Sequence, residues 1–228
     1  MVVMERVAAG TAMKKVLVVD DHDLVRLGII RLLNDVPGIC VVAEADSGET
    51  SLEKVRQYHP DIVFMDIRMP GIGGLEATRR ILAAHPEIKV IVVSAFSDEV
   101  YPSRLLNAGA SGYITKNADS AEVIMAVQTV IMNKVYVSPT LAQQMVTSNL
   151  NGRLDASPFS QLSERELQVA EMITSGRRVS DIADTLHVSP KTINTYKYRI
   201  FEKVGVNNDV ELTLSAVKFG LVDPSDLV

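Results

Sequence analysis

Two hydrophobic periodicities alternate between residues 15 and 135, and this alternation narrows the folds open to the chain more than any other feature. Short β-branched apolar runs are separated by stretches in which apolar residues recur every three or four positions. The runs predict five strands, at residues 16–19, 39–42, 62–65, 90–93 and 112–115, with helices between them. Because strands this apolar need cover on both faces, we predict an α/β fold with a doubly wound, five-stranded parallel sheet of order 2-1-3-4-5.

Polar residues stand where four of these strands end. Asp20 and Asp21 follow the first strand, Asp66 the third, Ser94 the fourth and Lys116 the fifth. Carboxyl ends of parallel strands share one edge of a sheet, and strands one and three are neighbours in this order, so the three aspartates should converge on one pocket. Two carboxylates about 5 Å apart repel by about 3 kcal/mol at an effective dielectric constant of about 20. The pocket therefore requires a cation, and all-oxygen ligands at a partly hydrated site favour Mg²⁺.

A magnesium ion beside a carboxylate, a hydroxyl and an ammonium suits phosphoryl transfer, where catalysis consists mainly of positioning and charge neutralisation. In this interpretation Asp66 is the nucleophile, Lys116 and the metal hold the transferred oxygens, and Ser94 hydrogen-bonds the acyl phosphate. The simpler alternative is that each aspartate only ends a strand or caps a helix. For Asp23 we adopt that alternative, because it precedes the helical stretch that begins at Leu24 and fits an N-cap.

A different organisation begins after residue 135. Residues 136–160 lose the alternation and become polar and turn-rich, which indicates a linker. Residues 161–228 show only helical periodicities and predict an all-α C-terminal domain. Ser163 and Glu166 have the spacing of a capping box, and Ser189 and Pro190 suit the cap and first position of a later helix. Two short helices joined by three or four residues predict a helix-turn-helix.

One face of the later helix is polar and basic. Between Lys191 and Lys203, four cations and Glu202 give a net charge of +3, in a chain whose 23 basic and 28 acidic residues give −5. A local basic patch of this kind can meet DNA phosphates and base edges in the major groove. The alternative is a solvated helix in an all-α domain. The residues that we expect to contact DNA are Lys191, Thr192, Asn194, Thr195, Lys197, Tyr198, Arg199 and Lys203.

Composition argues against two other classes of protein. No apolar run approaches the ~18 residues that a bilayer span needs, so no membrane association is expected. Cys40 is the single cysteine, so no internal disulfide can form, and its apolar surroundings predict a buried structural thiol in a reducing compartment. We therefore expect a cytoplasmic protein. Residues 1–12 are expected to form an N-terminal extension, ahead of an α/β domain of residues 13–135.

The α/β domain resembles a known family. Its segments VVDDHD, MDIRMPGIGG, VVSAF and GYITK are similar to the receiver domain of bacterial two-component response regulators. The resemblance implies that Asp66 is the phospho-acceptor. It also implies that Asp21, Asp66 and the backbone carbonyl of Arg68 ligate Mg²⁺ directly, while Asp20 acts through water.

The same resemblance assigns roles to three residues at the other strand ends. Ser94 and Lys116 are expected to bind the phosphoryl group, and Tyr113 stands where many receivers carry an aromatic that reports the state of the serine position. Phosphorylation would then alter a surface between residues 100 and 113. Taken alone, Tyr113 is equally consistent with simple packing on the strand.

The helical domain resembles a second family. The segments LSERELQVAEMITSG, IADTLHVSPKTINTYKYRIFEKV and DVEL are similar to the LuxR-type helix-turn-helix output domain of the NarL/FixJ class. In that class the last helix, here residues 210–219, often forms a dimer contact. Across the whole chain the resemblance is to global regulators of the GacA, UvrY and LetA type.

These inferences combine into one prediction of function. The chain is expected to be a phosphorylation-controlled transcription regulator that accepts a phosphoryl group on Asp66 from a sensor histidine kinase and binds promoter DNA as a homodimer. It would not be an enzyme beyond assisting its own phosphorylation and dephosphorylation. The alternative is a metal-dependent aspartyl phosphatase or phosphotransferase acting on a small molecule, although such enzymes usually carry a second carboxylate where this chain has Arg68. A third possibility is a helical domain that binds protein or RNA.

Overall fold

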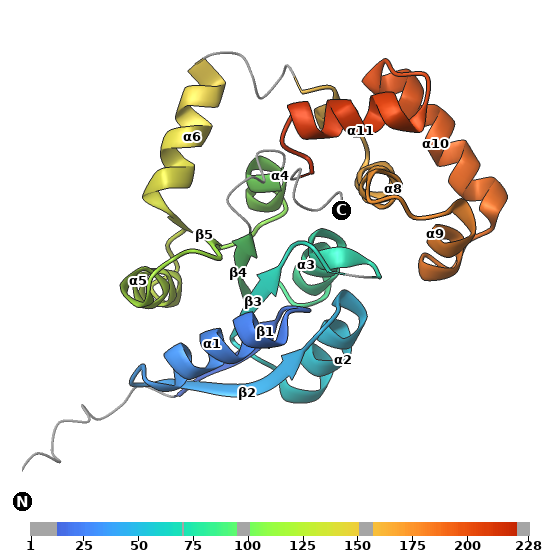
Figure 1. Cartoon of the computed structure of the whole chain (residues 1–228). Coiled ribbons are helices and arrows are strands. Elements are labelled where there is room, and N and C mark those ends of the chain that lie inside the picture. Colours follow the sequence, from blue (N-terminus) through green and yellow to red (C-terminus); the bar gives the residue numbers. More distant parts are fainter. Residues whose placement is uncertain (1–12, 70, 95–100, 151–156, 223–228) are drawn as a thin grey trace, which may run out of the picture.

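The computed structural model describes residues 13–69, 71–94, 101–150 and 157–222, so the extension expected at residues 1–12 lies outside the described residues. Its first part alternates strands and helices, as the periodicities predict (Figure 1). The elements are β1 (Lys14–Val19), α1 (Asp23–Asn34), β2 (Ile39–Ala45), α2 (Gly48–Tyr58), β3 (Ile62–Asp66), α3 (Gly73–Ala84), β4 (Lys89–Ser94), α4 (Tyr101–Asn107), β5 (Gly112–Thr115) and α5 (Ser120–Ile131).

The strands form one parallel sheet of order β2-β1-β3-β4-β5-β6. The predicted order is confirmed, but the predicted count of five strands is one too low. The sixth strand, β6 (Tyr136–Val137), pairs with Gly112 and Tyr113 of β5. It is two residues long and lies in the segment expected to be a linker, so it shows no periodicity that sequence reasoning could detect. Helix α6 (Pro139–Leu150) follows it directly.

Strand residues alternate between two buried layers, which is the pattern expected of a sheet covered on both faces. Val16 and Val18 of β1 pack with residues of α1 and α5, whereas Leu17 and Val19 face the side covered by α2, α3 and α4 (Figure 1). All four are essentially inaccessible to solvent, and full burial of each such side chain contributes about 1.5–3 kcal/mol. Cys40 is predicted to be buried, but it is only half-buried, because it lies on the edge strand β2.

The second part of the chain is helical throughout its described residues. It comprises the 3₁₀ turn η1 (Pro158–Gln161) and helices α8 (Glu164–Thr174), α9 (Val179–Thr185), α10 (Pro190–Val204) and α11 (Asp209–Lys218). Its centre includes Phe159, Leu167, Ile193 and Ile200, none more than about 1% exposed. The rings of Phe159 and Phe219 meet edge to face at 6.4 Å, which ties η1 to the end of α11.

Local capping explains where these helices begin. The capping box of Ser163 and Glu166 is confirmed at α8, and at α10 Ser189 accepts the amide hydrogen of Thr192, with Pro190 as first residue. The N-cap prediction for Asp23 is wrong, because His22 occupies that position in α1. Asp23 instead lies in the first turn, where its carboxylate forms a 2.6 Å ion pair with Arg26.

Candidate functional site

Three aspartates meet at the carboxyl edge of the sheet. Asp66 is the last residue of β3, and Asp20 and Asp21 follow β1, which is hydrogen-bonded alongside β3. Side-chain ligand atoms of these three residues and of His22 all lie within 4.8 Å of one another. Asp20 and Asp66 are each 1% exposed, so at least two of the carboxylates have lost nearly all contact with water.

Lys116 neutralises part of this negative charge. It follows β5, and its Nζ lies 2.8 Å from Asp66 Oδ2 and 3.0 Å from Asp20 Oδ2. The Lys116 amide donates a 2.7 Å hydrogen bond to the carbonyl of Ser94, which fixes the ends of β4 and β5 beside each other. The Lys116 ammonium thus pairs with two buried carboxylates. The third carboxylate, that of Asp21, forms no ion pair with a lysine or arginine among the described residues.

The pKa values of Asp66 and Lys116 reflect this excess of negative over positive charge in the pocket. Burial raises the pKa of Asp66 to about 7; Lys116 opposes the rise, while Asp20 and Asp21 add to it. Burial acts against the charged form of Lys116, but its partners Asp66 and Asp20 outweigh burial and raise its pKa above the ordinary value. The pocket is therefore short of positive charge near neutral pH.

The donor set fits a hard divalent cation. Two buried oxygens, Asp20 Oδ2 and Asp21 Oδ1, accept no hydrogen bond of good geometry from the described residues. Arg68 stands two residues after Asp66 and lines the same cleft as Asp21. Carboxylate oxygens with room for water are the ligands that Mg²⁺ prefers. The resemblance to receiver domains implies that Asp21, Asp66 and the Arg68 carbonyl would hold it, and the ion would supply charge for the oxygens of a bound phosphoryl group.

Ser94 and Tyr113 lie on the strands next to this pocket. Ser94 ends β4, one residue beyond Val93, which is paired in register with Asp66, and it is fully buried. Tyr113 belongs to β5 and is also fully buried, packed in the apolar layer with Val92 and Leu105. The structure therefore places both residues near the predicted site, with Tyr113 in an inward position. The surface expected to respond begins at Val100, which lies outside the described residues.

Glycines shape the loop that joins β3 to α3. Gly71 and Gly73 have φ angles of +80° and +71°, a region that favours glycine. Gly74 donates a 2.9 Å hydrogen bond to the carbonyl of Ile67 and lies so close to the end of β3 that a Cβ would fall 1.8 Å from the carbonyl oxygen of Asp66. The glycine-rich loop is thus both a turn and a close backbone contact with the site. Pro70 lies outside the described residues.

Sequence reasoning missed two residues that border the pocket. One is His22, whose Nδ1 lies 2.8 Å from Asp21 Oδ1 and 3.3 Å from Asp20 Oδ1. Arg26 donates a 2.7 Å hydrogen bond to the carbonyl of Asp20 and pairs with Glu44 of β2 at 2.9 Å. The adjacency of His22 to the two aspartates was a visible signal, but the contact of Arg26 with β2 was not.

Helix α10 presents the basic face that its sequence predicts. Ile193 and Ile200 are fully buried on the inner side. Of the residues expected to contact DNA, Thr192 and Lys197 are half-buried, and the exposed ones are Lys191, Asn194, Thr195, Tyr198, Arg199 and Lys203. Most of the predicted set is therefore available to a ligand from one side of the helix.

Two lysines of that set also have partners within the helical domain. Lys197 Nζ lies 2.7 Å from Asp209 Oδ2 at the start of α11. Lys203 pairs with Glu166, a carboxylate that is 4% exposed and also belongs to the capping box of α8. Removing Lys203 would leave a buried carboxylate without its cation, so a variant there would report on stability as well as on DNA.

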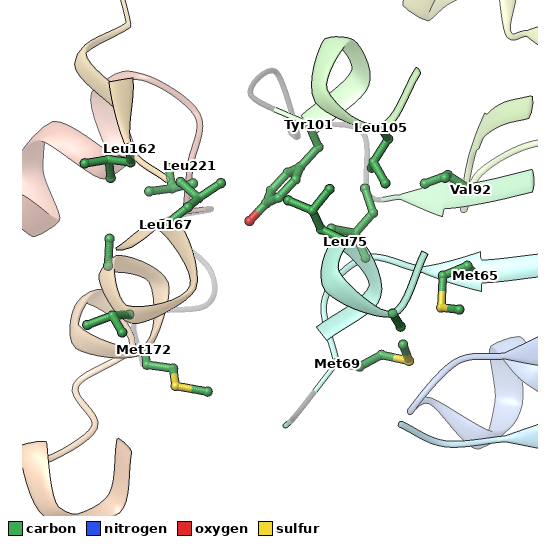
Figure 2. Packing of buried hydrophobic residues seen from close by; sticks show 14 of the residues in the cluster. Met65, Met69, Leu75, Val92, Tyr101, Leu105, Leu162, Leu167, Met172 and Leu221 are labelled. Atoms are coloured by element: carbon green, nitrogen blue, oxygen red, sulfur yellow. The ribbon is translucent and has the colours of Figure 1, made fainter. Parts of the chain in front are cut away.

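The helical domain contacts the surface on which the switch is expected. Tyr101 of α4 is 3% exposed, and its hydroxyl donates a hydrogen bond to the carboxylate of Glu171 of α8. Figure 2 shows Tyr101 reaching between Leu75 of α3 and Leu167 of α8. Arg104 Nη2 donates hydrogen bonds of 2.8 and 3.0 Å to the carbonyls of Phe159 and Ser160.

The loop after Asp66 contacts the same domain. Arg68 Nη2 donates a 3.0 Å hydrogen bond to the carbonyl of Leu221, and the side-chain amide of Gln168 donates to the carbonyl of Gly71. A cleft of about 360 Å³ separates the acidic pocket from α8 and is lined by residues of both domains, among them Asp21, Arg68, Glu171 and Arg177. The acidic pocket and the helical domain thus share a boundary.

Comparison with known proteins decides the family. A family model described as "Response regulator receiver domain" matches residues 16–128, and one described as "Bacterial regulatory proteins, luxR family" matches residues 160–216. Response regulator GacA of Pseudomonas syringae pv. syringae (strain B728a) is 54% identical over 93% of this chain and 100% of its own length. The chain belongs to the luxR-type response regulators.

A second relative and one solved structure are also similar to this response regulator. Response regulator UvrY of Escherichia coli (strain K12) is 45% identical over 94% of this chain and 99% of its own. The solved structure of RcsB from Salmonella enterica serovar Typhimurium, bound to a promoter in the presence of a beryllofluoride phosphomimetic, has a TM-score of 0.68 at 23% identity, covering 90% of this chain and 99% of that one. That likeness shows the shared fold.

The family assignment confirms the predicted resemblance to GacA- and UvrY-type regulators. The alternative of a small-molecule phosphatase or phosphotransferase finds no support in these matches. Within the described part of the chain, no helix combines the length and the apolar character that crossing a bilayer requires.

Proposed function

We propose that this response regulator accepts a phosphoryl group on Asp66 from a sensor histidine kinase. A carboxylate oxygen of Asp66 attacks phosphorus, the phosphorus–nitrogen bond of the donor phosphohistidine breaks, and its electron pair returns to the imidazole. Asp21, Asp66 and the Arg68 carbonyl would hold Mg²⁺, with Asp20 acting through water, and Lys116 would hold a phosphoryl oxygen. The observation that carries this proposal is the cluster of three carboxylates at one edge of the sheet, with the Lys116 ammonium 2.8 Å from Asp66.

Phosphorylation would replace one charge on Asp66 with about two and add acceptor oxygens. Lys116 would then be shared between Asp20 and the new group, and the buried Ser94 hydroxyl would hydrogen-bond to it. Tyr113 would report this change to α4. Because Tyr101 and Arg104 of that helix contact the helical domain directly, a shift of α4 would alter the contact between the domains.

The C-terminal domain, residues 161–228, would bind promoter DNA through α10, and promoter DNA is also the ligand of RcsB in the solved complex. The receiver would comprise residues 13–135 and the linker residues 136–160. Val210 and Leu214 are exposed apolar residues of α11, which suits the dimer contact that the family resemblance implies. A homodimer would bring two copies of α10 to paired half-sites and increase the number of phosphate contacts.

Magnesium affinity should fall as the pH is lowered through about 7, the pKa of the Asp66 carboxyl in this pocket. A carboxyl whose pKa is raised holds its proton up to that pH, and the proton competes with the cation for the same oxygen. We expect up to about tenfold weaker binding per pH unit below 7 and little change above it. Calorimetric titration at pH 8 and pH 6 measures this, and equal affinities would argue against Asp66 as a ligand.

Lys191→Ala should weaken promoter binding by about 1 kcal/mol and reduce the slope of log affinity against log salt by about 1, because Lys191 is exposed and would contact a phosphate. Fluorescence anisotropy with labelled promoter DNA at several salt concentrations measures both quantities. Lys134→Ala removes an exposed lysine of the other domain and serves as the matched control. If the two variants behaved alike, α10 would not be the DNA-binding helix.

A further inference from the structure

His22 lies beside the acidic pocket but has no part in the function proposed above. Its side chain is 63% exposed, and its Nδ1 lies 2.8 Å from Asp21 Oδ1 and 3.3 Å from Asp20 Oδ1. The backbone amide of His22 donates a 2.8 Å hydrogen bond to Asp20 Oδ1, which holds this residue in place at the start of α1. An imidazole nitrogen therefore faces the carboxylates from the solvent side.

We propose that His22 makes the acidic pocket a site for Zn²⁺, in competition with Mg²⁺. This inference rests on the metal site proposed above. The two ions would compete because they share Asp21, and zinc would use Asp20 and the His22 nitrogen where magnesium would use Asp66 and the Arg68 carbonyl. Magnesium takes oxygen ligands and gains nothing from an imidazole, whereas zinc binds nitrogen and carboxylate oxygen together. His22 would therefore raise affinity for zinc without changing affinity for magnesium.

The spacing of the ligand atoms suits one shared ion. Ligands about 2.0–2.1 Å from a tetrahedral zinc ion lie about 3.3 Å from one another. The separations of His22 Nδ1 from the Oδ1 atoms of Asp20 and Asp21 are 3.3 and 2.8 Å, so small movements would bring all three atoms to coordination distance. Two carboxylates and one imidazole would leave the fourth position open to water.

Lys116 need not leave when zinc binds. Its Nζ contacts the Oδ2 atoms of Asp20 and Asp66, whereas His22 faces the Oδ1 atoms of Asp20 and Asp21. The zinc ion and the ammonium would thus contact different oxygens of Asp20. The cleft of about 360 Å³ that Asp21 and His22 line provides access for the hydrated ion.

Calorimetric titration of the full-length chain with Zn²⁺ and, separately, with Mg²⁺ tests this proposal. His22→Asn should weaken zinc binding at this site by about tenfold or more and leave magnesium affinity within about twofold. His59→Asn is the matched control, because His59 is an exposed histidine with a φ of 47° that asparagine tolerates, and it should change neither affinity. Co²⁺ in place of Zn²⁺ should give a visible absorption spectrum that His22→Asn alters and Mg²⁺ suppresses.

The outcomes separate this proposal from the one on which it rests. If the unaltered protein bound no Mg²⁺, the magnesium site itself would be lost. If it bound Mg²⁺ but His22→Asn left zinc affinity unchanged, the role of His22 would be overturned while the magnesium site stood. Equal losses for both metals in His22→Asn would also overturn it, since they would show that His22 only orients Asp21.

Discussion

Asp66→Asn is expected to abolish labelling of the response regulator by radiolabelled acetyl phosphate or by a partner kinase. The asparagine amide keeps the shape of the side chain but has no oxygen nucleophile, and it removes one ligand of the magnesium site. Asp20 and Asp21 should not replace it, because they follow β1, which is not adjacent to β4, whereas the buried Ser94 stands one residue beyond the β4 position paired with Asp66. Incorporated label per chain, measured with and without Mg²⁺, reports the result.

Asp23→Asn is the control for this experiment. It makes the same chemical change three residues after Asp20, but at a carboxylate that is 81% exposed and turned toward Arg26. The Asp23 variant should keep full labelling.

The Asp66 variant should also unfold at the same or a higher temperature than the unaltered protein without metal, since a carboxyl with a raised pKa is held in an unfavourable site. Undiminished labelling of the Asp66 variant would refute the assignment.

Gly74→Ala should both destabilise the receiver and impair labelling. A Cβ at this position would lie 1.8 Å from the carbonyl oxygen of Asp66 and 2.9 Å from Cα of Ile67, and both neighbours are backbone atoms that cannot rotate away. Either β3 or the start of α3 must move, at an expected cost of about 3 kcal/mol or more. The thermal unfolding temperature and the yield of acetyl phosphate labelling measure the two effects.

Gly28→Ala provides the matched comparison. Gly28 lies inside α1, and a Cβ added there would meet no atom within 4 Å outside its own helix, so alanine should stabilise that helix by up to about 1 kcal/mol and leave labelling unchanged. If Gly74→Ala lowers the unfolding temperature and Gly28→Ala raises it, the loss at Gly74 comes from close backbone contact and not from the helix propensity of alanine. If Gly74→Ala were as well tolerated as Gly28→Ala, the close packing of the start of α3 against the end of β3 would be wrong.

The pocket could be predicted from sequence because topology alone brings its residues together. Asp20 and Asp21 follow one strand and Asp66 ends its neighbour, so a parallel sheet of the predicted order leaves them no other place to lie. The same reasoning put Ser94 and Lys116 at the ends of β4 and β5. Each of these positions depends on where a strand ends, and the end of each apolar run in the sequence marks that point.

Contacts between distant side chains could not be predicted in this way. The pair of Lys203 and Glu166 spans 37 positions and exists only because α8 and α10 pack together. Arg68 reaches the carbonyl of Leu221, 153 positions away, across the boundary between the domains. Neither contact produces a periodic pattern in the sequence, because each is made by one long side chain whose partner depends on how the elements pack together.

The phosphorylation state of Asp66 is expected to determine the affinity of this response regulator for promoter DNA. The most direct test is the dissociation constant of the full-length chain for promoter DNA, measured in Mg²⁺ with and without beryllofluoride, for the unaltered protein and for Asp66→Asn. Coupling of about 1–3 kcal/mol would tighten binding by the unaltered protein about 5- to 150-fold, and the variant should not respond. Equal affinity of the unaltered protein in both conditions would show that Asp66 does not control DNA binding.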